Sequence, residues 1–347
     1  MKKIIYIAMM NLQLFADQVM NTTASEGLSA EMKTFYDKNL LMMAKPKLVH
    51  HQFGQKRSIP KNGGKNIEFR RFASLPKAIT PLTEGITPPG QTLEVLKVDA
   101  TLKQYGDYVK LTDVVQLTAI DNLLVESTDL CGAQGGQTLD TVVRDVMHTG
   151  TNVFYAPKVA ADGTVTEITS RADLTTECLL TTDVVDQVVA FLRAQNAPTI
   201  DGYYVAIIHP YAAYDLTRDP NWRKPREYCD PDKLYKGEIG EYGGVRFVDT
   251  SEAKIYSGEG CPAGLGVFGT LFLGANAYGC IDIEGEEAGE NLEVIVKPLG
   301  SGGTDDPLNQ RGTCGWKAME TAAVLIENYM VRVESCSKAH SAKVTAN

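Results

Sequence analysis

The stretch Gly264-Leu265-Gly266-Val267-Phe268-Gly269 has the G-x-G-x-x-G spacing of a dinucleotide-binding loop, and Glu284 follows at about the right distance for a ribose ligand. In such a loop the pyrophosphate sits at the N-terminus of the helix that follows. Here a turn over 257–262 precedes the glycines, and residues 270–273 have the pattern of a strand. Close backbone packing in a sheet is therefore the preferred interpretation. A nucleotide-dependent enzyme built on Gly264–Gly269 is the alternative.

His209 is the second candidate for chemistry, because it ends the apolar run 203–208 and has Asp215 and Asp219 nearby in sequence. Nothing supplies a nucleophile, since the sequence contains no G-x-S-x-G motif and no cysteine in a recognisable elbow. The adjacent Glu286 and Glu287 lie in a glycine-rich stretch, too solvated for a general acid and base. We expect His209 to cap or pack, and we expect no catalytic residue and no enzyme.

The metal-binding residue types are scattered. Seven cysteines include no C-x-x-C pair, and five histidines include no H-x-x-x-H spacing. An odd, scattered set argues against both a disulfide framework and a zinc site. We expect reduced and mostly buried thiols, no metal site and no cofactor. The cysteines are Cys131, Cys178, Cys229, Cys261, Cys280, Cys314 and Cys336.

The 347 residues are 44% hydrophobic and 22% charged, as in soluble globular proteins, and the length suggests about two or three domains. No apolar run approaches the ~18 residues that a membrane helix needs. Residues 1–10 resemble a secretory signal, but the apolar stretch is short and Leu14 spoils a cleavage motif ending at Ala16. We expect no membrane association and favour a protein that is not secreted; Met10 is an alternative initiator.

The formal net charge of −9 is unevenly distributed. Residues 45–77 contain nine Lys/Arg and one acid, Glu68, whereas residues 282–293 contain six acids and no base. The basic segment could be a solvated face or bind nucleic acid, but it lacks aromatic repeats and any nucleic-acid motif. We prefer the hypothesis that this segment of one copy lies on the acidic segment of another. The candidate inter-subunit residues are Lys65, Arg70, Arg71, Lys77, Asp282, Glu284, Glu286, Glu287, Glu290 and Glu293.

The N-terminal third predicts a short helix and then a long β-arm. Apolar residues from Met32 to Met43 have helical spacing that Pro46 stops. Residues 66–72 and 93–102 alternate with period two, and they flank a proline-rich stretch over 73–91. A loop longer than about 12–15 residues is more often functional or partner-bound than idle.

The remaining pattern mixes helices and strands without a regular repeat, which favours an α+β fold over a doubly wound or barrel enzyme. Thr112 and Asp113 cap a long helical segment in which Gly132, Gly135 and Gly136 predict a kink or a break. Residues 150–180 indicate a hairpin or loop. A helix capped by Thr182, a strand over 203–208 and a short helix from Pro210 follow. We expect strands near 244–249, 264–273, 278–284, 291–298 and 313–334.

The stretch Asp305–Lys317, DDPLNQRGTCGWK, combines an Asp-Pro pair, spaced glycines and Trp316. Asp before Pro disfavours a helix, and Asn and Gly supply the backbone angles of a tight reversal. We expect an anchored loop that enters a core strand.

These segments, taken in order, resemble one family: the major capsid proteins of tailed bacteriophages with the HK-97-like fold. MNLQLFA (10–16) is similar to the opening of many phage head proteins, and residues 80–113 resemble the arm of the coliphage N-four type of major capsid protein. HPYAAYDL (209–216) and DPLNQRGTCGWK (306–317) resemble later landmarks of that type. The resemblance covers nearly the whole chain except Lys2-Lys3 and residues 150–180.

The resemblance implies a division of the chain into an N-terminal arm with a short helix (1–59), an E-loop β-arm (60–111), and a P-domain spine helix with its excursion (112–180). An A-domain (181–263) and returning P-domain strands (264–347) complete it. It also implies that the glycines of Asp306–Lys317 permit tight packing between subunits.

The function implied is structural. Copies of the chain would self-assemble through hexamers and pentamers into an icosahedral head shell around double-stranded DNA, which faces the inner surface without sequence-specific binding. Scaffolding, portal and decoration proteins are the further partners implied. The protein would be made in the host cytoplasm and reside in the virion. The alternatives are the nucleotide-dependent enzyme and another homo-oligomeric phage structural protein of the tail or decoration class.

Overall fold

The computed structural model describes residues 49–59, 64–82, 84–85, 87, 90–119, 123–160, 163–222, 239–283, 293–302 and 306–347. The chain divides into two compact units. The first unit contains Gly106–Gly135 and Leu292–Lys317, and the second contains Ala44–Tyr105, Gly136–Asn291 and Ala318–Asn347. No helix in the described ranges is both long and apolar enough to cross a membrane.

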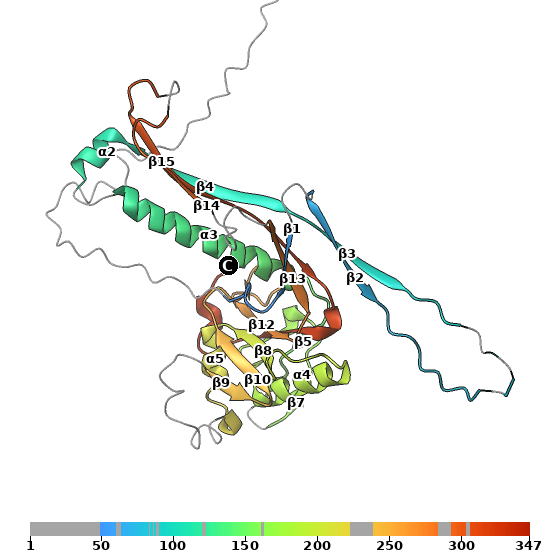
Figure 1. The fold of residues 1–347 in the computed structure, drawn as a ribbon. Helices are drawn as coiled ribbons and strands as arrows, with labels where there is room; N and C mark the ends of the chain where they lie inside the picture. The colour runs from blue at the N-terminus through green and yellow to red at the C-terminus, as the bar shows by residue number, and fades with distance from the viewer. Residues whose placement is uncertain are drawn as a thin grey trace, which may run out of the picture. The chain divides into compact units, whose positions relative to one another are not determined.

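A mixed sheet forms the centre of the second unit (Figure 1). Its strand order is β5-β16-β12-β8-β10-β9, with β11 paired to β12. The strands β5/β16 and β8/β10 pair in parallel, and the other pairs in this sheet are antiparallel. The strands are β5 (Val153–Tyr155), β8 (Tyr204–Ile208), β9 (Gly240–Tyr242), β10 (Val245–Asp249), β11 (Ile255–Tyr256), β12 (Val267–Leu273) and β16 (Met330–Ser335).

Alternating side chains of this sheet serve two different cores, as the period of a strand requires. Ala206 of β8 and Phe272 of β12 pack with the apolar faces of helices α4 (Thr182–Ala194) and α5 (Pro210–Leu216). Ile207 and Leu271, which point the other way, pack with Val143 and Met147 in the last turns of helix α3 (Leu123–Met147). The sheet is therefore buried on both faces. The valines of α4 are buried together because their helical spacing places them on one face of the helix.

The predicted β-arm is a two-stranded antiparallel hairpin in the second unit (Figure 1). Strand β2 (Asn66–Phe72) pairs with β3 (Val95–Thr101) over seven residue pairs, from Asn66↔Thr101 to Phe72↔Val95. The described residues between the strands form no helix or strand. The period-two prediction for residues 66–72 and 93–102 is confirmed.

Two shorter sheet pairings complete the second unit. Strand β1 (Gln55–Ile59) pairs in parallel with β13 (Tyr278–Ile283), which pairs antiparallel with the second half of β15 (Arg311–Val324). The excursion over 150–180 contains the hairpin of β6 (Lys158–Val159) and β7 (Val165–Thr166), as predicted, and a 3₁₀ turn at Arg171–Asp173. Further 3₁₀ turns are Glu327–Tyr329 and Ser341–Lys343.

The first unit contains the first half of β15, strand β14 (Glu293–Lys297), most of β4 (Lys103–Thr112), helix α2 (Asp113–Thr118) and the start of α3. Strands β14 and β4 both pair with β15. Thr112 is the N-cap of α2, as predicted, because its side chain accepts a hydrogen bond from the Val115 amide at 3.3 Å. Leu111, Val115 and Leu123 form a small buried cluster here.

The loop before β15 is anchored as the sequence predicts. The buried Asp306 carboxylate accepts hydrogen bonds from the amides of Gln310 (3.1 Å) and Arg311 (2.7 Å), and Asn309 turns the chain at φ 56°. Asn tolerates this left-handed conformation better than most residues do. A β-strand then begins at Arg311.

Gly315, one of the two glycines of this motif, serves packing within the chain. The expectation that these glycines permit tight packing between subunits stays a prediction. A Cβ atom on Gly315 would lie 2.7 Å from Tyr108 Cβ and 2.9 Å from the Asp107 carbonyl oxygen of β4. On the opposing strand, a Cβ on Gly106 would lie 2.7 Å from the Trp316 carbonyl oxygen. The two glycines therefore let β4 and β15 approach closely, and the Trp316 indole donates a hydrogen bond to Gln134 Oε1 (3.0 Å).

Four expectations about elements are wrong. Thr182 is the first residue of α4, and its N-cap is Thr181. Helix α3 runs through Gly132, Gly135 and Gly136 without a break, so a division into two helices at these glycines is wrong, and the helical segment is interrupted instead between α2 and α3. The single strand expected over 313–334 is two strands, β15 and β16, separated by the 3₁₀ turn. Strand β4 was not predicted at all. The helix expected over 32–43 lies outside the described residues.

Candidate assembly surface

The base of the arm is fixed to the second unit by apolar contacts. Ile67, Phe69 and Val98 of the hairpin pack against a buried cluster that contains Ile281 of β13 and Ala323 of β15. A Cβ on Gly279 would lie only 3.0 Å from Phe69 Cζ, so a glycine is needed where this ring presses on β13. The hairpin therefore leaves the subunit from a rigid base.

The outer part of the arm exposes large apolar side chains. Ile79 is 86% exposed and Leu82 is 76% exposed. Isolated exposed apolar residues are ordinary, but several on one short segment indicate a surface that a partner covers. The full set is Phe72, Leu75, Ile79, Leu82, Leu93, Val95 and Leu96. We call it the apolar arm set.

The charged residues of the arm are partly neutralised within the hairpin. Glu68 Oε1 lies 2.6 Å from Arg70 Nε and 3.0 Å from Lys97 Nζ, on paired strands. These contacts, chiefly the hydrogen bond from Arg70 and then that from Lys97, lower the pKa of Glu68 to about 2. Lys65, Arg71 and Lys77 are exposed on or beside the hairpin. Glu68, the only acid among residues 45–77, is thus paired with one cation of that segment, Arg70, and with Lys97 on the opposite strand.

Most of the acidic residues proposed for the contact between subunits lie outside the part of the chain that the structure describes. Glu284, Glu286, Glu287 and Glu290 lie outside the described residues. Asp282 belongs to β13, and Glu293 begins β14. The charge-pairing hypothesis stays a prediction.

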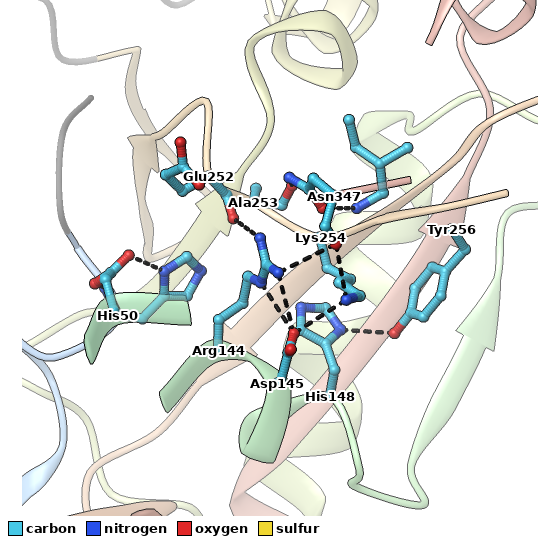
Figure 2. Close-up of polar contacts among 11 residues, drawn as sticks. His50, Arg144, Asp145, His148, Glu252, Ala253, Lys254, Tyr256 and Asn347 are labelled. Carbon is cyan, nitrogen blue, oxygen red and sulfur yellow. Dashed lines mark hydrogen bonds and ion pairs between the residues drawn. The ribbon is translucent and has the colours of Figure 1, made fainter. Parts of the chain in front are cut away.

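The C-terminal end of α3 is held by a polar network (Figure 2). The buried Arg144 guanidinium donates to the carbonyl oxygens of Glu252 (2.8 Å) and Asn347 (3.2 Å). Lys254 Nζ donates to Asp145 Oδ1 (3.1 Å) and to the Asn347 carbonyl oxygen (2.9 Å). A guanidinium buried this deeply is costly unless carbonyl and carboxylate oxygens surround it, as they do here.

His148 closes the same network on its other side. Its Nδ1 lies 2.8 Å from the Tyr256 hydroxyl, and its carbonyl oxygen accepts a hydrogen bond from Arg332 (the His148–Tyr256 contact is drawn in Figure 2). Burial, and then the positive charge of Arg332, holds the pKa of His148 well below its usual range. Burial raises the pKa of Tyr256 to about 12. Both groups are therefore neutral at pH 7 and act as structural hydrogen-bonding groups.

A second charged cluster lies entirely within the second unit and was missed from the sequence. Glu334, fully buried, accepts two 2.6 Å hydrogen bonds from Arg171 and one of 2.9 Å from Arg332 Nε. The Arg171 guanidinium stacks over the Tyr256 ring at 3.8 Å. Arg171 and Glu334 are 163 positions apart, so no spacing could have indicated the pair.

His209 is a capping residue, as predicted. Its Nδ1 accepts the Tyr211 amide hydrogen bond (3.1 Å) at the N-cap of α5, and Asp219 instead accepts hydrogen bonds from the Thr182 amide and hydroxyl. Burial, with a smaller contribution from nearby His340, lowers the pKa of His209 to about 4.

The lowered pKa of His209 predicts acid sensitivity. The unfolded chain binds a proton at His209 below about pH 6.5 and the folded chain only below about pH 4, so stability is full above pH 6.5 and falls as the pH drops through this window. His209→Asn keeps a good N-cap and removes the titration. Urea unfolding of the subunit at pH 7.5, 6 and 4.5 should show a smaller loss for the variant, by on the order of 2–3 kcal/mol. An equal loss in both proteins would contradict the assignment.

The G-x-G-x-x-G stretch lacks the structure of a nucleotide site. Gly264 turns at φ 72°, and β12 begins at Val267, so a strand follows where a helix N-terminus is required. A Cβ on Gly269 would lie 2.7 Å from His148 Cε1, and one on Gly266 would overlap Val344. These two glycines serve close packing, as preferred from the sequence.

The described thiols are poorly suited to nucleophilic chemistry. None of the six described cysteines forms a disulfide, and five of them are buried. Burial is the main reason that the pKa of Cys131 and that of Cys336 rise to about 11. A thiol that stays protonated is a weak nucleophile.

Comparison with known families decides between the remaining hypotheses. The family model described as "Phage capsid protein" matches residues 95–275, slightly more than half of the chain. The chain belongs to this phage capsid protein family. No match was found among curated proteins.

Solved capsid structures share the fold of this capsid protein. The capsid of cyanophage P-SCSP1u has a TM-score of 0.64 at 13% identity, covering 89% of this chain and 94% of that one. The capsid of Ralstonia phage GP4 has a TM-score of 0.63 at 14% identity, covering 92% and 98%. The head structure of Helicobacter pylori bacteriophage KHP40 has a TM-score of 0.62 at 11% identity, covering 92% and 98%. The predicted α+β, HK-97-like fold is confirmed.

The capsid protein is accordingly a structural component of the phage head and not an enzyme. It is a major capsid protein that self-associates into the icosahedral shell of the virion. The nucleotide-dependent enzyme and the tail or decoration alternatives are set aside. The surface that matters for function is therefore one that meets other copies.

Proposed function

We propose that the arm over residues 60–111 is the E-loop of this capsid protein and that it lies across a neighbouring subunit within hexamers and pentamers. The single observation that carries the proposal is the apolar arm set on a rigidly based hairpin. Burying such side chains stabilises a contact by roughly 25 cal/mol per Å² of apolar surface. A neighbour provides that cover in a shell.

The remaining domain assignment follows from the same proposal. Residues 1–59 are the N-terminal arm and short helix, residues 112–180 with 264–347 are the P-domain, and residues 181–263 are the A-domain at the capsomer axis. The packing of α4 and α5 on one face of the central sheet supports a compact A-domain.

We further propose that the basic arm meets the acidic segment over 282–293 of the neighbour. Opposite potentials at a repeated contact steer docking and set its register more than they add affinity. Each exposed pair contributes only about 0–1 kcal/mol, so the effect depends on many copies acting together. With a Debye length of about 8 Å at physiological salt, added salt should slow assembly.

Charge reversal tests this contact. Arg70→Glu with Arg71→Glu should block assembly, because both side chains then repel the acidic segment. Adding Glu286→Lys and Glu287→Lys to the same chain should partly restore it. Light scattering would follow assembly at several salt concentrations, and electron microscopy would identify hexamers, pentamers or shells.

The paired design separates docking from folding. Circular dichroism of the unassembled double variant should match that of the wild-type subunit. Lys338→Glu with Lys343→Glu, two exposed cations outside both the arm and residues 181–263, serves as the charge-matched control. Assembly with no salt dependence and no rescue would leave the basic arm as a DNA-facing or merely solvated surface.

We also propose which type of major capsid protein this is and which partners it has. The sequence likeness over 80–113 supports the coliphage N-four type. Scaffolding, portal and decoration proteins are the expected partners, and the DNA packaged inside would meet the inner surface without sequence-specific contacts. Synthesis would take place in the host cytoplasm.

A further inference from the structure

Three side chains of metal-binding type meet in the second unit. They are His51, in the turn before β1; Cys280, on β13; and Glu320, on β15. One ligand atom from each lies within 4.8 Å of the others, the only such group of three among the described His, Cys, Asp and Glu residues. Cys280 and Glu320 are buried, whereas the His51 side chain is 35% exposed.

The sheet register explains why the cysteine and the carboxylate are neighbours. In the antiparallel pair β13/β15, Cys280 lies opposite Ala322. Because alternate residues share a face, Glu320 lies diagonally beside Cys280 on the same side of the sheet. The two donors are thus held by the backbone ladder rather than by flexible loops.

The turn that carries His51 is held on both sides. The His50 amide donates to Asp140 Oδ1 of α3 (2.8 Å), and the His50 carbonyl oxygen accepts from the Tyr278 hydroxyl (2.6 Å). A Cβ on Gly54 would lie 2.9 Å from Cys280 Sγ, so the turn packs directly onto the cysteine. A site whose supporting backbone is fixed in this way is preorganised.

The hydrogen bonding of Glu320 is a second observation that points to a bound cation. Its Oε1 lies 3.0 Å from His51 Nε2, yet this buried oxygen accepts no hydrogen bond with acceptable geometry. A buried carboxylate oxygen without a donor is costly. A simple His51–Glu320 ion pair would satisfy the oxygen only with an N–H directed at it, and the contact does not have that geometry. A cation between the three donors uses the free electron pairs of all of them.

We propose that His51, Cys280 and Glu320 bind a divalent transition-metal ion, with zinc as the best chemical match. Imidazole nitrogen, thiolate sulfur and carboxylate oxygen are all zinc ligands, and the thiolate disfavours magnesium and calcium. The fourth tetrahedral position faces the exposed side of His51 and takes a water molecule. Binding deprotonates the Cys280 thiol and releases that proton, and the thiolate and carboxylate together balance the 2+ charge.

The ion would clip the turn before β1 onto the β13/β15 pair. Because only the folded chain presents the three donors together, binding stabilises the folded state by an amount that grows with free metal concentration. The proposal concerns the single subunit and is independent of the arm contact.

Cobalt(II) is the probe, used on tag-free full-length subunit. One equivalent should bind and give the near-ultraviolet absorption of a thiolate–cobalt bond together with the visible bands of a tetrahedral ion. Cys280→Ser should lose the thiolate absorption. Cys261→Ser, which removes a partly exposed thiol elsewhere, should keep it.

A second variant is needed in case Cys280→Ser, a change at a buried position, disturbs folding. His51 is partly exposed, so His51→Gln should fold, while its zinc affinity should fall by more than about 100-fold, beyond the roughly 10–100-fold that is typical for loss of a supporting residue. Zinc should raise the Tm of the wild type and not that of His51→Gln. Thiolate absorption unchanged in Cys280→Ser, equal zinc effects on both Tm values, or no binding at all would overturn the proposal.

Discussion

Glu334→Gln is expected to lower the free energy of unfolding of the subunit by about 3–5 kcal/mol, the range for removing one partner of a buried ion pair. The carboxylate is fully buried and receives three charged hydrogen bonds from Arg171 and Arg332. Glutamine has nearly the same volume, so the loss reports the two guanidinium groups that are left without a counter-charge. Arg171 would also be less firmly held over the Tyr256 ring.

Urea unfolding monitored by tryptophan fluorescence measures this change, with an unaltered m-value showing that the folded and unfolded states keep their compactness. Glu68→Gln is the matched control. It removes another carboxylate that bridges two cations, but those cations are exposed on the arm, where solvent screens the pair, so the unfolding midpoint should barely move. If the two variants lost similar free energy of unfolding, the burial of Glu334 would not be the reason for its contribution to stability.

Deleting the arm tip should abolish shell assembly and leave the subunit folded. Removing Ala73–Gln91 and closing the hairpin with a short glycine turn takes away Leu75, Ile79 and Leu82 but preserves β2, β3 and the Phe69 anchor. Because those deleted residues that the structure describes form no helix or strand, we expect the core to lose little. Size-exclusion chromatography and electron microscopy should show soluble subunits and no shells.

The thermal unfolding of the truncated subunit is the internal control, since its Tm should match that of unassembled wild-type protein. A milder variant, Leu75→Ser with Ile79→Ser and Leu82→Ser, keeps the length of the arm and removes only its apolar surface. Shells at wild-type yield from either protein would show that the tip contributes no essential contact between subunits.

The structural elements that could be predicted from the sequence are those determined by neighbouring residues. The alternation over 66–72 and the valine spacing of α4 each identify an element from neighbouring residues, and Asp306 with Asn309 identifies a loop by its own hydrogen bonds. The errors arise where packing overrides local preference. Gly132 costs roughly 1 kcal/mol in a helix, yet α3 continues through it.

The clusters that hold the second unit together were not predictable from the sequence. Glu334 finds Arg171 across 163 positions, and His51 meets residues more than two hundred positions away. Neither set has a characteristic spacing, because the strand order of the fold brings its members together. The G-x-G-x-x-G stretch shows the opposite case, in which a spacing typical of nucleotide binding has another cause. Gly266 and Gly269 are glycines because neighbouring side chains leave no room for a Cβ atom.

The position of β16 in the central sheet has a consequence for synthesis. This strand, Met330–Ser335, lies between β5 and β12, so a segment encoded late must be inserted between two that left the ribosome far earlier. Until residue 335 has emerged, β5 lacks β16, its partner among the described strands, and β12 lacks one of its neighbours. Non-local pairing of this kind folds slowly and only after the whole set of strands is present. A nascent chain that lacks β16 therefore cannot present a finished subunit to its neighbours, and the order of translation itself delays assembly until this strand has been made.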